Sequence, residues 1–231
     1  MTQYAIHNSF SPVQAVIFDM DGLMVDTEPL ALQAWQQVLA AYGYTLDEAL
    51  YRQMVGRRTD QSTQMLLDVY ALPLTAAELM RRKTAVFARM RAQGVPVMPG
   101  LAELEAALAA RAMPWGVATS SPRAHAVEIL QQLGLTAVCQ AIAAGDEVAQ
   151  GKPAPDIYLL AAQRLGVAPT ACLALEDSAP GCQAALAAGM QVVAVPNGFT
   201  ETADFSFVPH VLSSLHDVAA QLDRLVGETA V

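Results

Sequence analysis

Residues 13–22 read VQAVIFDMDG, and this stretch decides the fold. Its first six residues form a short run rich in β-forming residues, in which Gln14 is the only polar side chain. Such a run is typical of a parallel strand that is buried on both faces of its sheet. The run stops at Asp19 and Asp21, so the sequence predicts two carboxylates at the carboxyl end of an internal strand.

Downstream of residue 114, apolar runs alternate with helical patterns. The predicted strands are 115–118, 141–144, 172–175 and 191–195, and the predicted helices between them are about 123–133, 154–165 and 180–188. This alternation indicates a parallel sheet with helices on both faces. The strand at 13–18 must join that sheet, because a lone buried strand has no pairing partners. We expect the strand at 191–195 to be the last one.

The residues between the first strand and the rest of the sheet show only helical periodicity. Apolar side chains recur at helical spacing over about 28–42, 46–54, 60–70, 76–93 and 100–111. We therefore predict an α/β protein with a Rossmann-like parallel sheet core, formed by residues 1–23 and 96–231, and an inserted α-helical domain, residues 24–95.

Composition limits the classes of function. Of 231 residues 54% are hydrophobic and 15% are charged, which excludes a disordered chain. The net charge of -9 makes nucleic acid an unexpected partner, because binding to a phosphate backbone needs a basic surface. The charge-free stretch 178–200 contains prolines and glycines, so we expect no membrane span. Three cysteines without paired spacing and no secretory signal favour the cytoplasm.

Charge is divided between the two predicted domains. The insertion carries eight basic and seven acidic residues, whereas the remainder carries five basic and fifteen acidic ones. One interpretation is that acidic residues of the core hold a cation and basic residues of the insertion meet an anionic substrate. The alternative is a chance distribution of charge on solvated surfaces.

Polar side chains gather where the predicted strands end. In doubly wound sheets ligands bind just beyond the carboxyl ends of the strands. Five carboxylates at one edge would repel one another unless a cation joined them, and oxygen ligands of this kind suit Mg²⁺. Of the first two aspartates, one can be a nucleophile and the other an acid and base. The strand-end residues are Asp19, Asp21, Thr119, Ser120, Asp146, Glu176 and Asp177.

Two further segments are candidates for binding a phosphate. Thr119, Ser120 and Ser121 precede a predicted helix and can present hydroxyl and N–H groups to an anion, or Thr119 can simply cap the helix. Lys152 lies in a loop stiffened by Pro153 and Pro155, which could aim its ammonium at one point. The alternative for Lys152 is an ordinary solvated charge.

These residues resemble, in order and spacing, the four motifs of the haloacid dehalogenase-like (HAD) hydrolase superfamily, over essentially the whole chain. Further segments resemble the branch that contains β-phosphoglucomutase and small sugar-phosphate phosphatases. The four motifs are Asp19-Met20-Asp21-Gly22, Thr119, Lys152-Pro153 and Glu176-Asp177-Ser178. The further segments are residues 24–26, Thr27-Glu28-Pro29, Gly56, Pro99-Gly100 and residues 152–156.

The resemblance implies a catalytic set. Asp19 would attack the phosphoryl group and form an aspartyl-phosphate, and Asp21 would protonate the leaving oxygen and then activate water. Thr119 and the Ser120 backbone would hold the phosphoryl oxygens. Lys152 would neutralise charge on the nucleophile and the phosphoryl group.

The resemblance also implies a cofactor and a moving domain. Mg²⁺ would be held by Asp19, the carbonyl of Asp21, and Asp177, with Glu176 close by. The insertion would be a helical cap that closes over the site, excludes water and selects the substrate. Its basic residues that could meet an anionic substrate are Arg57, Arg58 and Lys83, although each could equally be a solvated charge.

The expected function is Mg²⁺-dependent hydrolysis of a small phosphorylated metabolite, a sugar phosphate, by a phosphoric monoester hydrolase that is a monomer. A phosphosugar mutase is the alternative. Mutases of this branch carry a histidine where this chain has Ala31 and an arginine where it has Thr59, which disfavours mutase activity. A non-catalytic binding protein is a third possibility, disfavoured because Asp19 and Asp177 are present.

Overall fold

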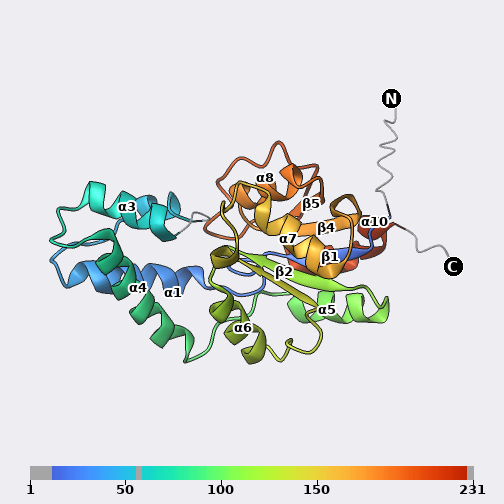
Figure 1. Ribbon diagram of the computed structural model, residues 1–231, viewed down its shortest axis with the longest axis horizontal. Coiled ribbons are helices and arrows are strands. Elements are labelled where there is room, and N and C mark those ends of the chain that lie inside the picture. The colour runs from blue at the N-terminus through green and yellow to red at the C-terminus, as the bar shows by residue number, and fades with distance from the viewer. Residues whose placement is uncertain (1–11, 56–58, 228–231) are drawn as a thin grey trace.

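The structure, a computed structural model, describes residues 12–55 and 59–227. Its centre is a sheet (Figure 1). The strand order is β3-β2-β1-β4-β5-β6. All neighbouring strands are parallel, which confirms the predicted α/β class with a parallel sheet. The strands are β1 (Ala15–Phe18), β2 (Trp115–Thr119), β3 (Ala141–Ala144), β4 (Cys172–Glu176), β5 (Gln191–Ala194) and β6 (His210–Val211).

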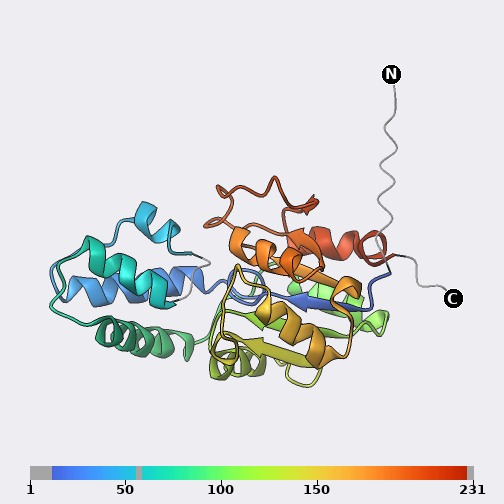
Figure 2. The same ribbon diagram turned by 45° about the horizontal axis from the view of Figure 1, so that its top comes forward.

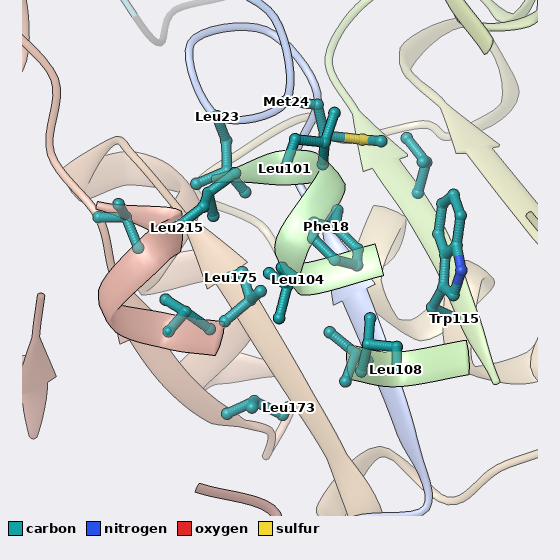
Figure 3. Close-up of a cluster of buried hydrophobic side chains, with 14 of the residues drawn as sticks. Phe18, Leu23, Met24, Leu101, Leu104, Leu108, Trp115, Leu173, Leu175 and Leu215 are labelled. Carbon is teal, nitrogen blue, oxygen red and sulfur yellow. The ribbon is translucent and has the colours of Figure 1, made fainter. Parts of the chain in front are cut away.

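Large apolar side chains fill one face of the sheet. Phe18 of β1 and Leu175 of β4 pack there with Leu104, and the Phe18 ring meets Trp115 edge to face at 5.4 Å (Figure 3). Because side chains alternate along a strand, the neighbours of Phe18 in β1 point to the opposite face. The helices on this face are α5 (Leu101–Ala110), α6 (Arg123–Gln132), α9 (Leu215–Ala220) and α10 (Leu222–Val226).

Small side chains line the opposite face. Alanines of β1, β2, β3, β4 and β5 meet two helices there, which lets the helix backbones approach the sheet closely. These helices are α7 (Asp156–Leu165) and α8 (Ala179–Ala187). Two 3₁₀ turns complete the core, η1 (Gly145–Glu147) and η2 (Pro169–Ala171). The buried strand runs of the sequence therefore reflect helices on both faces, as expected for parallel strands.

The segment that follows β1 folds around its own apolar cluster. Trp35, Leu39, Leu66, Leu79 and Phe87 are buried in it, separate from the two clusters of the sheet. Figures 1 and 2 show these helices as a group beside the sheet. They are α1 (Glu28–Ala40), α2 (Glu48–Arg52), α3 (Thr59–Val69) and α4 (Ala76–Arg91).

Two backbone segments join this helical group to the sheet, and they are hydrogen-bonded to each other. Val25 and Val97 form an antiparallel bridge, and the N–H of Met98 donates to the carbonyl of Met24 at 3.0 Å. A second connection comes from α4, where the buried Arg91 pairs with Glu128 of α6 at 2.9 Å.

The prediction that the strand at 191–195 is the last one is wrong. β6 adds a sixth strand beyond β5, with Val193 opposite His210 and Ala194 opposite Val211. It has two residues, neither of them buried, so the sequence contains no apolar run that would predict it. Helices α9 and α10 were likewise not predicted. Among the residues that the structure describes, no helix combines the length and the apolar character needed to cross a bilayer.

Strand order places the candidate residues. The chain leaves β1 toward β2 and β3 on one side and returns to β4 on the other, so the order reverses between β1 and β4. In sheets of this order ligands bind at that reversal, outside the carboxyl ends of the strands. Asp19 follows β1, and Asp177 follows β4.

Candidate active site

A pocket of about 130 Å³ lies between the carboxyl ends of the strands and the helical group. Residues at the ends of β1, β2 and β4 form one wall, and residues of α1, α2, α3 and α4 form the other. The wall from the sheet contains most of the predicted site: Asp19, Asp21, Thr119, Ser120, Ser121, Lys152 and Asp177. The pocket therefore lies at the edge of the sheet where the sequence analysis expects a site.

Asp19 is fixed by the sheet and by one cation. Its N–H donates to the carbonyl of Leu175 in β4 at 2.9 Å, so β-sheet pairing sets its backbone position. Its carboxylate forms an ion pair with Lys152, and both side chains are buried. Burial raises the pKa of Asp19 well above its usual value, and the attraction of Lys152 offsets only part of that rise.

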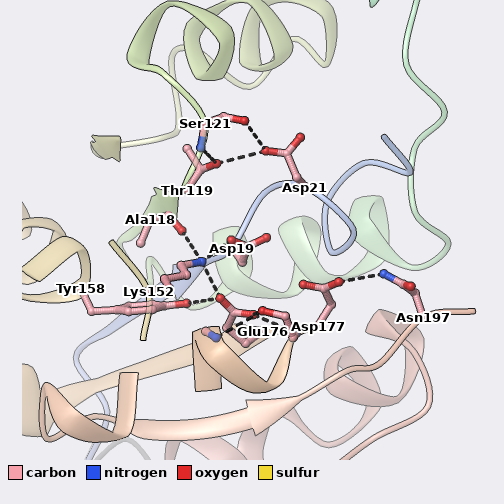
Figure 4. A network of polar contacts seen from close by, with 12 residues as sticks. Asp19, Asp21, Ala118, Thr119, Ser121, Lys152, Tyr158, Glu176, Asp177 and Asn197 are labelled. Carbon is pink, nitrogen blue, oxygen red and sulfur yellow. Dashed lines mark hydrogen bonds and ion pairs between the residues drawn. The ribbon is translucent and has the colours of Figure 1, made fainter. Parts of the chain in front are cut away.

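Lys152 reaches the strand ends from the loop before α7. Besides pairing with Asp19, its ammonium donates to Glu176 Oε1 at 2.5 Å and to the carbonyl of Ala118 at 3.2 Å (Figure 4). Burial lowers the pKa of Lys152, but the attraction of Asp19 and Glu176 outweighs it and raises that pKa above its usual value. The ammonium therefore stays charged, aimed at Asp19.

Glu176 lies behind Lys152 and does not line the pocket. Its Oε1 also accepts the Tyr158 hydroxyl at 2.9 Å, and its Oε2 accepts the N–H and hydroxyl of Ser178 at 3.0 and 2.9 Å. Both oxygens are thus engaged by protein donors. In this arrangement Glu176 positions the ammonium of Lys152, and its predicted place beside a metal stays a prediction.

Asp21 is directed toward the end of β2 by three hydroxyl groups. Thr27 donates to its Oδ1 at 2.8 Å. Thr119 and Ser121 donate to its Oδ2 at 3.1 and 2.8 Å (Figure 4). Thr119 in turn accepts the N–H of Ser121 at 3.0 Å. Asp21 is thereby held at the pocket wall, and Ser120 of the loop after β2 also lines the pocket.

Asp177 is held by a residue that the sequence analysis did not single out. The side-chain amide of Asn197 donates to Asp177 Oδ2 at 2.8 Å and to the carbonyl of Gly22 at 3.0 Å. Burial raises the pKa of Asp177 well above its usual value, and the negative charges of Asp19 and Glu176 raise it further. Asn197 joins the loop after β1 to the loop after β4.

The carboxylate oxygens of these groups are suitable ligands for a hard divalent cation. Asp19, Asp177 and Glu176 bring three buried carboxylates close to a single ammonium, so negative charge is in excess. No set of three or more acidic, histidine or cysteine side chains arranged for a metal occurs within residues 12–55 and 59–227. Mg²⁺ does not require such a set, because it usually binds one or two carboxylates together with waters and substrate phosphate. Asp19 and Asp177 both line the pocket, and burial raises the pKa of each, so a cation bound there would stabilise their charged forms.

The helical wall of the pocket contains one basic and one acidic side chain, Lys83 and Glu28. Lys83 of α4 is buried and lines the pocket, with its ammonium 4.2 Å from the centre of the Phe87 ring. Burial lowers the pKa of Lys83 to about 8. Glu28 of α1 also lines the pocket, and burial raises its pKa to about 7. The predicted contacts of Arg57 and Arg58 fall outside the described residues.

One predicted strand-end carboxylate does not join the site. Asp146 follows β3 but accepts the N–H of Arg123, the first residue of α6, at 2.9 Å. It does not line the pocket. β3 is two strands away from β1, and the turn after it directs the carboxylate to the helix start instead, where it satisfies a free N–H.

The sequence analysis gave no role to Asn197, Thr27 and Tyr158, which hold carboxylates of the site, although Thr27 lies in a segment that carries the family resemblance. One of these roles could have been found. Asn197 follows β5 by three residues, so the same strand-end argument applied one strand further would have included it. Thr27 and Tyr158 carried no such signal, because their partners are set by how helices pack on the strand ends.

Gly22 is expected to be intolerant of substitution. Its φ is +92°, and a Cβ there would overlap the Asp177 carboxylate and lie 2.8 Å from Asn197 Nδ2. Backbone strain and overpacking together should make Gly22→Ala lower the free energy of unfolding by about 2–4 kcal/mol. Gly43 is the matched control, with φ +79° and open space around its Cβ position. Gly43→Ala should cost about 1–2 kcal/mol, from strain alone.

Urea denaturation of both variants measures the difference. Equal losses would contradict the close contact between Gly22 and the Asp177 carboxylate.

Residues 13–189 match the family model described as haloacid dehalogenase-like hydrolase. Among curated proteins, fructose-1-phosphate phosphatase YqaB of Escherichia coli (strain K12) is 39% identical over 180 residues, which are 78% of this chain and 95% of that protein. Protein CbbY of Rhodobacter capsulatus is 36% identical over 219 residues, 90% of this chain and 96% of that protein.

A solved structure agrees with the sequence relatives. The crystal structure of CbbY from Rhodobacter sphaeroides in complex with phosphate superimposes with a TM-score of 0.81 and 31% identity. The match covers 89% of this chain and 96% of the other. Similarity therefore extends over the sheet and the inserted helices together.

Proposed function

The chain belongs to the haloacid dehalogenase-like hydrolase family, and from this premise we propose that it is a Mg²⁺-dependent phosphatase of a sugar phosphate that works through an aspartyl-phosphate. Its class, phosphoric monoester hydrolase, follows from the family match and the phosphatase among its relatives. One observation carries the proposal: the buried Asp19–Lys152 pair at the end of β1, facing a pocket. We further propose that the protein works as a cytoplasmic monomer.

The proposed reaction has two steps. A carboxylate oxygen of Asp19 attacks phosphorus, the P–O bond to the sugar breaks, and the sugar oxygen takes a proton from Asp21. Water then attacks phosphorus, gives a proton back to Asp21, and the P–O bond to Asp19 breaks. Inorganic phosphate and free Asp19 result. The split into two displacements replaces one difficult step with two easier ones.

The neighbouring groups stabilise charge in both steps. Phosphoryl transfer depends mostly on positioning and on electrostatic stabilisation, which the Lys152 ammonium supplies beside Asp19. The hydroxyl of Thr119 and the loop at Ser120 and Ser121 would hold phosphoryl oxygens. Mg²⁺ held by Asp19, Asp177 and the carbonyl of Asp21 would, when bound, offset the charge shared by carboxylate and phosphate.

The inserted helices would act as a cap. We propose residues 24–95 as the cap domain and residues 1–23 with 96–231 as the catalytic core. The paired segments around Val25 and Val97 are the hinge in this proposal. Closure at such a hinge would exclude water from the pocket and bring the helical wall to the substrate.

A test of product identity separates the phosphatase from the mutase alternative. The substrates are fructose 1-phosphate, suggested by the activity in the name of one relative, and glucose 1-phosphate. We expect free phosphate from at least one of them and no glucose 6-phosphate. Position 31 contributes only a methyl group to the pocket, so it offers no acid or base for a second phosphoryl transfer. Formation of glucose 6-phosphate without phosphate release would overturn the proposal.

Mg²⁺ binding is expected to depend on Asn197. This residue orients Asp177 without carrying charge, and loss of such a supporting partner typically weakens metal binding about 10–100-fold. Isothermal titration of the protein with MgCl₂ should show that weakening in Asn197→Ala. The exposed Gln131→Ala is the control and should bind like the wild type. An unchanged affinity in Asn197→Ala would contradict the assignment of Asp177 as a ligand.

A further inference from the structure

The helical wall of the pocket gathers one polar side chain from each helix of the insertion. Glu28 of α1, Tyr51 of α2, Ser62 of α3 and Lys83 of α4 all line the same space. Apolar side chains such as Trp35 surround them. This wall is distinct from the sheet wall with its Asp19–Lys152 pair, and the mechanism proposed above makes no use of Glu28, Tyr51 or Ser62.

Glu28 is held firmly and keeps one oxygen available. The Tyr51 hydroxyl, itself buried, donates to Glu28 Oε2 at 2.5 Å. Among the described residues no other donor reaches this carboxylate. Its second oxygen therefore offers an acceptor at the pocket surface. Glu28 is only half-buried, so this oxygen is open to a hydrogen-bond donor of a molecule bound in the pocket.

Lys83 supplies the complementary donor. Its ammonium lies against the Phe87 and Trp35 rings, at 4.2 and 5.6 Å from their centres, and makes no ion pair with a described carboxylate. Cation–π contacts leave ammonium protons free for other acceptors. Within the described residues, Glu28 and Lys83 are the only acidic and the only basic side chain of this wall.

A balanced pair of one acceptor and one donor suits neutral hydroxyl groups better than a second phosphate, which needs an excess of positive charge. Resting on the phosphatase function proposed above, we propose that Glu28 determines specificity by accepting hydrogen bonds from hydroxyls of the substrate's carbon skeleton. The favoured substrate class is then a polyhydroxylated monophosphate rather than a bisphosphate or a phosphate ester without hydroxyls. Tyr51 is a positioning residue for Glu28.

The test compares fructose 1-phosphate with p-nitrophenyl phosphate, which offers no hydroxyl groups. The ratio of their kcat/KM values isolates recognition of the carbon skeleton from the phosphoryl chemistry. In Glu28→Leu this ratio should fall about 10–100-fold, the loss expected for a hydrogen bond to a charged group. Glu28→Gln retains an acceptor oxygen and should lose less. Tyr51→Phe leaves the carboxylate in place and should lower the ratio less. The change should come from a higher KM for fructose 1-phosphate more than from a lower kcat.

Two further arms complete the experiment. The exposed cap residue Glu48 gives a matched control, and Glu48→Gln should keep the wild-type ratio. Fructose 1,6-bisphosphate should be a poorer substrate of the wild type than fructose 1-phosphate. Thermal denaturation verifies that each variant is folded.

The outcomes are distinguishable. An unchanged ratio in folded Glu28→Leu, or a wild-type preference for the bisphosphate, would overturn the role of Glu28 while leaving the phosphatase function intact. Absence of Mg²⁺-dependent turnover of every ester by the wild type would overturn the phosphatase function, and this inference with it.

Discussion

Replacing Asp19 with asparagine is expected to lower kcat for phosphate release by at least about 10⁴-fold, the scale seen when a catalytic nucleophile is removed. An amide oxygen does not attack phosphorus at a useful rate, and no other described carboxylate is paired with Lys152 at the pocket wall. The predicted loss should appear in kcat, because the pocket and the other phosphate-binding groups remain.

The same variant is expected to fold at least as well as the wild type without metal. Burial raises the pKa of Asp19, which means that the charged carboxylate is the costly form in the folded protein. An amide of the same shape removes that cost, and Lys152 keeps Glu176 as its partner. Steady-state assays measure the loss of kcat, and thermal denaturation in EDTA measures the stability of the variant. Retention of more than about 1% of kcat would exclude Asp19 as the nucleophile.

Replacing Lys152 with methionine is expected to damage both activity and stability. Removal of a preorganised charge near the phosphoryl group should lower kcat about 10²–10³-fold. The free energy of unfolding should fall by about 3–5 kcal/mol, because Asp19 and Glu176 are left as buried carboxylates without their cation. The large effect on stability distinguishes Lys152 from Asp19.

A second substitution tests the reason for that loss. In Lys152→Met combined with Glu176→Gln, one uncompensated charge is removed, so part of the stability should return while activity stays low. Urea denaturation and phosphate assays measure the two properties separately. If the double variant is no more stable than Lys152→Met alone, the instability does not come from the buried charge of Glu176.

Much of the architecture could be predicted from local patterns. The apolar run before Asp19 has no alternation, which is typical of a strand covered on both faces. Strand ends then place Asp19, Thr119 and Asp177 at one edge of the sheet. What the pattern lacks is the direction of each side chain. Asp146 also ends a strand, yet the turn after β3 directs it to the start of α6.

Features that depend on tertiary packing were not predictable. β6 has two residues that are not buried, so its pairing with β5 leaves no trace in hydrophobicity. The role of Glu176 as a support for Lys152 arises because a loop and a strand meet, and the sequence shows only two charges far apart. The contact between Tyr51 and Glu28 likewise follows from how α2 packs on α1.

The most direct test of the account is phosphate release by the wild-type protein from a panel of sugar phosphates, nucleotides and p-nitrophenyl phosphate, with MgCl₂ and with EDTA. The account predicts turnover that requires Mg²⁺, with a sugar monophosphate as the best substrate. No phosphate from any compound by folded, Mg²⁺-loaded protein, or equal turnover in EDTA, would contradict it.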